Sequence, residues 1–196
     1  MPIEIGILKL IHILCLVYWL GADLGVFYSS YYLVNEKLSR DTRINVSKIL
    51  FFLDQAPRIS MILIFPSGIH LAKSLGYLNI SYSMVISIWL IAISWLILVC
   101  VLHVKGQAVK KLALFDYWLR IMFVLGMSYV FLNIVINQPE YIWAGKKILA
   151  FTITVICGLI IRKKLRSFEP AFVSLIEGKD TAESNQILKM SIASSR

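Results

Sequence analysis

The chain has 196 residues, of which 59% are hydrophobic and 16% are charged, and its mean hydropathy is +0.77. A soluble domain of this size does not need so much apolar sequence to fill one core, so we expect an integral membrane protein. The formal net charge of +9 could indicate nucleic acid. However, the basic residues stand in short clusters between apolar runs, where they set membrane topology. We therefore expect a lipid bilayer as the surroundings and no nucleic-acid partner.

Five segments are apolar and long enough to be transmembrane helices, each of which needs about 20 residues. They lie at residues 5–30, 58–76, 82–104, 116–137 and 143–161. The first segment lacks a basic region before it and an A-x-A cleavage site after it, so it is expected to be a span and not a signal peptide. The predicted fold class is all-α, with a transmembrane helical bundle over residues 1–166 and a cytoplasmic tail over residues 167–196.

The positions of Lys and Arg predict how the spans are oriented. Basic residues gather in the links after the first and third spans and in the segment after the fifth, at Lys37, Arg40, Arg43 and Lys48, at Lys105, Lys110 and Lys111, and at Arg162, Lys163, Lys164 and Arg166. The second link has only Lys73, and the fourth, NQPEY, has none. We expect the N-terminus outside and the C-terminus inside, with a bacterial inner membrane as the simplest location. In the tail, PAFVSLIE predicts a short amphipathic helix from Pro170, and the remainder is expected to be mobile.

One face of the first span carries a histidine, a tryptophan and an aspartate. At about 100° per residue, His12, Trp19 and Asp23 fall within about 20° of one another. Because a charge inside a membrane is costly unless it faces protein or water, this stripe is predicted to face the interior of the bundle.

Two histidines are predicted at matching depth near the outer surface. At 1.5 Å per residue, His12 lies about 10 Å and His70 about 9 Å from that surface, and Lys147 enters the fifth span at a similar height. Either histidine alone could simply bond a neighbouring carbonyl, but a level pair is what an axial haem ligand pair or a copper site requires. Haem ranks above copper because the spans lack a Met-rich stripe. The walls of a haem slot could come from Trp19, Gly21, Ser67, Gly68 and Trp89.

A second polar cluster is predicted near the inner surface, where Asp23 approaches Arg58 and Arg120, with His103 and Asp116 close by. The first interpretation is an ion-pair network that fixes helix packing. The alternative is a proton path or an anion site, in which Arg58 or Arg120 would hold a carboxylate of a ligand.

Three motifs carry a family resemblance: HILCLVYW with His12, RISMILIFP with Arg58, and WAGKKIL with Lys147. They resemble motifs of the HemJ-type protoporphyrinogen oxidases and their broader kin, which include the CopD-type copper-resistance membrane domains. The resemblance implies a small helical bundle associated with b-type haem and with oxidation of a tetrapyrrole. It matches His12 to the family's histidine, Arg58 to its second-span arginine and Lys147 to its W-x3-K lysine.

The leading functional hypothesis is a membrane protein that binds haem b, and that transfers electrons or oxidises a small hydrophobic or tetrapyrrole-like substrate. His12 and His70 would be the axial ligands, and Arg58 and Lys147 would hold acidic groups such as the haem propionates. Two alternatives stay open: a non-catalytic accessory subunit of a larger membrane complex, and a transporter of copper or a small molecule. Partners could therefore be other membrane subunits or further copies of this chain.

Overall fold

The computed structural model describes residues 3–179 and 181–195, and every regular element in them is a helix. Within these residues, five helical stretches are long and apolar enough to cross a membrane. They are Ile3–Leu33, Arg40–Ser74, Tyr82–Lys105, Lys110–Asn137 and Pro139–Glu177. The predicted all-α membrane fold with five spans is therefore confirmed, whereas the orientation of the spans stays a prediction.

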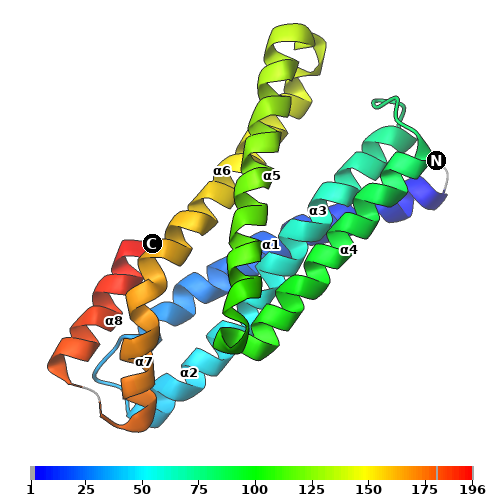
Figure 1. Ribbon diagram of the computed structural model, residues 1–196. Coiled ribbons are helices and arrows are strands. Elements are labelled where there is room, and N and C mark those ends of the chain that lie inside the picture. The colour runs from blue at the N-terminus through cyan, green and yellow to red at the C-terminus, as the bar shows by residue number, and fades with distance from the viewer. Residues whose placement is uncertain (1–2, 180, 196) are drawn as a thin grey trace. The chain divides into compact units, whose positions relative to one another are not determined.

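The chain forms two compact units, residues 1–109 and 110–196. The first unit contains α1 (Ile3–Leu33), α2 (Arg40–Leu53), α3 (Gln55–Ser74), α4 (Tyr82–Lys105) and the short 3-10 helix η1 (Gly106–Val109). In this unit α3 packs against both α1 and α4, and α2 packs against α1 (Figure 1). The division between the two units falls after the third span. The predicted boundary at residue 166, between the bundle and a cytoplasmic tail, is of another kind, because it rests on the polarity of the tail, and it stays a prediction.

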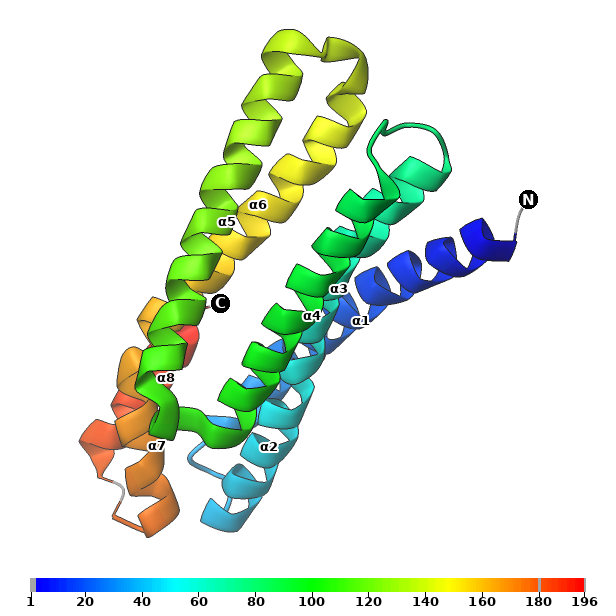
Figure 2. The ribbon, with the colours of Figure 1, turned by 45° about the vertical axis from the view of Figure 1, so that its right-hand side comes forward.

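The second unit contains α5 (Lys110–Asn137), η2 (Pro139–Tyr141), α6 (Ile142–Lys164), η3 (Leu165–Ser167), α7 (Phe168–Glu177) and α8 (Ala182–Ser195). Figure 2 shows α5 and α6 as an antiparallel hairpin joined through η2. Gly145 permits their close approach, because a Cβ atom there would lie 3.2 Å from Cγ2 of Ile134. The two predicted spans at 116–137 and 143–161 form this hairpin.

The helix α2 lies between the first two predicted spans, where the sequence predicts only a connecting segment. It begins at an N-cap, Ser39, whose Oγ accepts the backbone N–H of Thr42 at 3.2 Å. Arg43 is only 4% exposed, and its Nε donates to the carbonyl oxygen of Leu33 at 2.9 Å. Since Leu33 ends α1, the Arg43 side chain satisfies a carbonyl that a helix terminus leaves without an intrahelical partner. One of the basic residues that indicates topology therefore also holds α2 against α1.

Replacing Arg43 with alanine is expected to lower the free energy of unfolding by about 1.5–3 kcal/mol. The lost hydrogen bond has a charged donor, and its loss removes the partner of the Leu33 carbonyl oxygen. Chemical unfolding in detergent micelles, followed by circular dichroism, measures this cost. Arg40→Ala is the matched control, because Arg40 is exposed at the start of the same helix. Equal destabilisation by both substitutions would contradict the role given to Arg43.

The tail after residue 166 folds as two packed helices. The predicted amphipathic helix is present as α7, which begins two residues before Pro170. The remainder, expected to be mobile, instead forms α8 and packs against α7. Leu175 of α7 and Leu188 of α8 are both fully buried. Leu188 and Ile192 are one turn apart and give α8 a small apolar face. Most other residues of α8 are polar, so this face is difficult to recognise in the sequence.

Candidate functional site

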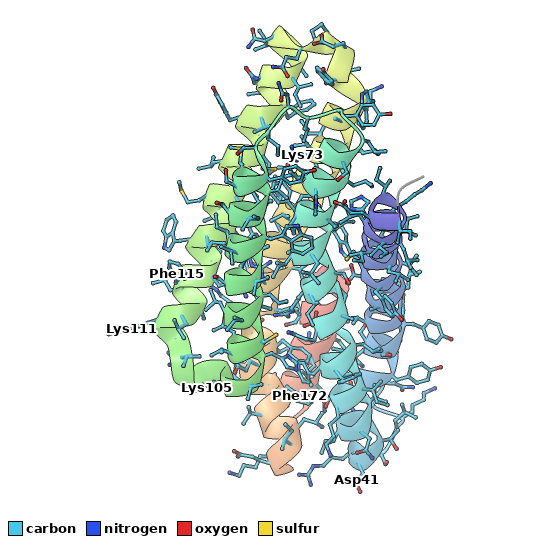
Figure 3. The ribbon with its side chains drawn as sticks, turned by 90° about the vertical axis from the view of Figure 1, so that its right-hand side faces the viewer. Asp41, Lys73, Lys105, Lys111, Phe115 and Phe172 are labelled. Carbon is cyan, nitrogen blue, oxygen red and sulfur yellow. The ribbon has the colours of Figure 1, made fainter. Side chains whose placement is uncertain are left out.

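The polar groups of the first unit gather where α1 and α3 pack together in antiparallel directions (Figure 2). We call this set the α1–α3 polar seam, and it consists of Glu4, His12, Trp19 and Asp23 on α1 and of Arg58, Ser67 and His70 on α3. Figure 3 places Lys73 at one end of this unit and Asp41 and Lys105 at the other. In the predicted polar stripe of the first span, Trp19 is buried and His12 is half-buried, whereas Asp23 is exposed.

His12 meets α3 through a buried serine. Its Nδ1 lies 3.1 Å from Oγ of Ser67, which is fully buried and which donates its own hydroxyl hydrogen to the carbonyl oxygen of Ile64 at 3.0 Å. A hydroxyl has only one hydrogen to donate, and with that hydrogen directed to Ile64, Ser67 accepts from the Nδ1–H of His12. In this arrangement the lone pair of the neutral imidazole is on Nε2.

Gly68 provides the space that the His12 ring occupies. A Cβ atom at this position would lie 3.0 Å from Cε1 of His12 and 3.5 Å from its Nδ1. Two neighbouring residues of α3, Ser67 and Gly68, thus position the same ring, one through a hydrogen bond and the other through the absence of a side chain. Pro66 precedes them, and α3 continues through it from Gln55 to Ser74.

His70 has a different partner. Its Nε2 lies 3.5 Å from Oε1 of Glu4, whose side chain is 61% exposed. Glu4 precedes His12 by eight residues, about 12 Å along α1. A metal ion shared by the two histidines would need a ring nitrogen from each within about 2 Å of it. In the structure His12 forms a hydrogen bond with Ser67 and His70 lies within ion-pair distance of Glu4, and the predicted pair of axial ligands stays a prediction.

A copper ion held by side chains alone would need several donors in one place. Among residues 3–179 and 181–195, no group of three or more His, Cys, Asp or Glu side chains is placed to hold a metal ion. The predicted copper site therefore stays a prediction.

The other end of the seam contains Trp19, Asp23 and Arg58. Trp19 is buried, and its indole N–H donates a hydrogen bond to the Asp23 carboxylate. The positive charge of Arg58 attracts this carboxylate, and the negative charge of Asp54 repels it. Arg58 forms an ion pair with Asp54, one helical turn earlier. The predicted approach of Asp23 and Arg58 is thus accompanied by a second acid, Asp54. The spacing of four residues between Asp54 and Arg58 is the feature of the sequence that could have predicted this ion pair.

Arg120 lies in the second unit with partners of its own. Its Nε donates to Oδ2 of Asp116 at 3.0 Å, and Nη1 of Arg162 donates to the same oxygen at 2.9 Å. Asp116 is fully buried. Asp23 and Arg58 belong to the first unit and Arg120 to the second, so the predicted approach of Arg120 to Asp23 stays a prediction. Arg162, which the sequence indicates only as a topology signal, has a structural role.

Lys147 also belongs to the second unit. Its Nζ lies 5.2 Å from the centroid of the Trp143 ring, one turn earlier on α6, which is within the range of a cation–π contact. The W-x3-K motif thus describes two side chains that touch on one helix face.

Comparisons of the chain with protein-family models, with curated proteins and with solved structures find no match. The resemblance to the HemJ-type and CopD-type proteins stays a prediction that rests on the three motifs.

Proposed function

We propose that this protein is a membrane redox protein that binds haem b through His12. The observation that supports the proposal is the hydrogen bond from Nδ1–H of His12 to Ser67, because it leaves the lone pair on Nε2. Histidine ligands of metals characteristically donate their other ring N–H to a second group, which fixes the tautomer and the direction of the ring. The motif resemblance points to the same histidine.

Haem b, when bound, would supply a one-electron couple between ferric and ferrous iron. The chain's own contribution is to hold the His12 ring. Ser67 fixes the tautomer and Gly68 makes room for the imidazole against α3. In this proposal His70 is not a ligand, because its Nε2 is engaged with Glu4. The predicted roles of Arg58 and Lys147 toward acidic groups of haem stay predictions, since these cations contact Asp54 and Trp143 respectively.

The proposal is tested by the haem content of single variants after expression with added haem. His12→Ala is expected to lose most of its bound haem, and His70→Ala is expected to retain it. His103→Ala is the matched control, since His103 is exposed near the end of α4. Haem retained in His12→Ala, or lost only in His70→Ala, would overturn the assignment of the ligand.

Replacing Ser67 with alanine is expected to weaken haem binding about 10–100-fold, because the variant loses the group that orients the ligating ring. Competitive transfer of haem to apomyoglobin measures the change. Ser60→Ala is the control, because Ser60 is a buried serine on the same helix. If the two serine variants release haem equally fast, Ser67 does not act through His12.

Proton conduction along the seam is a second candidate function. Titratable groups occur at three successive levels of one helix pair, namely at Glu4 with His70, at His12 and at Asp23. Such groups inside a membrane are typical of proton relays. Proton flux into liposomes that is lost in Asp23→Asn but not in Asp41→Asn would favour this function, and absence of flux in the unaltered protein would exclude it.

A further inference from the structure

A buried carboxylate joins α5 to α6 in the second unit and holds two arginines. Asp116 is fully buried, and its Oδ2 accepts from Arg120 at 3.0 Å and from Arg162 at 2.9 Å. The three ionised side chains together carry a charge of +1. The carboxylate therefore neutralises only one of the two cations, and the group as a whole favours a further negative charge.

The surplus positive charge is exposed at Arg162. The side chain of Arg162 is 38% exposed, whereas that of Arg120 is 12% exposed. A guanidinium has five N–H donors in a fixed plane, and Arg162 uses its Nη1 for Asp116. Because Asp116 fixes one edge of the group, the rest of the plane is presented outward with a set orientation.

The parts of α5 and α6 on either side of the Asp116–Arg162 ion pair have the composition of a membrane interface. Arg162 lies in the last turn of α6 with Lys163 and Lys164, where the apolar part of the helix ends, and Arg166 follows in η3. On α5, Trp118 is 55% exposed and lies two residues from Asp116. Figure 3 labels Phe115, which is also exposed, and Lys111, one turn earlier on α5. Exposed aromatic and basic residues gather where lipid headgroups begin.

We propose that Arg162, oriented by Asp116, binds the phosphate of an anionic phospholipid in the leaflet where α6 ends. The planar fork of a guanidinium matches two phosphate oxygens, which a lysine ammonium does not. An anionic lipid also balances the surplus charge of the buried group, and the basic residues beside it add attraction that does not depend on geometry. This site lies in the second unit and does not depend on the proposed haem site.

Native mass spectrometry of the full chain tests the proposal, with phosphatidylglycerol and phosphatidylcholine titrated in a mild detergent. The unaltered protein is expected to bind phosphatidylglycerol about tenfold more tightly, and Arg162→Gln is expected to lose this preference. Arg166→Gln removes the same charge from an exposed neighbour and is expected to keep most of it. Equal losses in both variants would mean attraction by charge alone and would overturn the proposal.

Two further measurements distinguish the remaining explanations. Arg162→Lys keeps the charge beside Asp116 but lacks the fork, so it is expected to lose a large part of the preference even if Arg162→Gln does not fold. An unchanged preference in Arg162→Lys would overturn recognition by the guanidinium. Inorganic phosphate at millimolar concentration is expected to leave the bound phosphatidylglycerol in place. Displacement by phosphate would identify a site for a soluble anion and would overturn the assignment to lipid.

Discussion

Replacing Asp116 with alanine is expected to lower the free energy of unfolding by about 3–5 kcal/mol, because removing one partner of a buried ion pair leaves the other uncompensated. In this protein the removal leaves two guanidiniums, those of Arg120 and Arg162, facing each other where the carboxylate stood. Their repulsion adds to the cost of burying them, so α5 and α6 are expected to separate more easily in this variant.

Reversible unfolding in mixed detergent micelles measures the stability of the Asp116→Ala variant. Asp41→Ala is the control, because Asp41 is exposed in the first turn of α2 and is worth at most about 1 kcal/mol there. The triple replacement of Asp116, Arg120 and Arg162 by apolar residues of similar volume is expected to recover most of the loss. A small effect of Asp116→Ala, comparable to that of Asp41→Ala, would contradict the structural role of the buried carboxylate.

The second large effect is expected at Gly68. A valine there is expected to cost about 1–3 kcal/mol, because its Cβ would lie 3.0 Å from the His12 ring and overpack the contact between α1 and α3. The same substitution displaces the imidazole from Ser67, so we expect loss of haem binding together with loss of stability.

Gly126→Val is the matched control for Gly68→Val. Gly126 is an exposed glycine of α5 at which a Cβ atom would meet nothing within 4 Å. This substitution is therefore expected to change stability and haem content little. Comparable losses in the two variants would show that valine perturbs these helices generally, and would remove Gly68 from its role in positioning His12.

Much of the fold could be predicted because its signals are local. Runs of about 20 apolar residues identify membrane helices without any knowledge of their packing. The 3.6-residue period places His12, Trp19 and Asp23 on one face of α1, and in the structure His12 contacts α3 and Trp19 is buried, whereas Asp23 is exposed. The helix α2 was harder to predict, because its basic residues resemble those of a loop. Only the tertiary contact between Arg43 and Leu33 shows what one of them does.

The partners of the polar residues could be predicted less well than their positions. Depth along a helix is known only to within a few residues, so it cannot distinguish a His12–His70 pair from separate contacts to Ser67 and Glu4. Likewise, depth places Arg120 level with Asp23 but does not show that an acid one turn away, Asp116, is a partner of Arg120. Contacts at spacing i, i+4 are available to any helix and compete with contacts between helices.

The central claim is that His12 ligates haem b, and the absorption spectrum of the unaltered protein tests it most directly. The protein would be expressed with added haem, purified in mild detergent, and measured before and after reduction with dithionite. We expect a Soret band in proportion to protein, shifted on reduction and absent from His12→Ala. A haem-replete preparation with no Soret band, or a band that His12→Ala keeps unchanged, would contradict the claim.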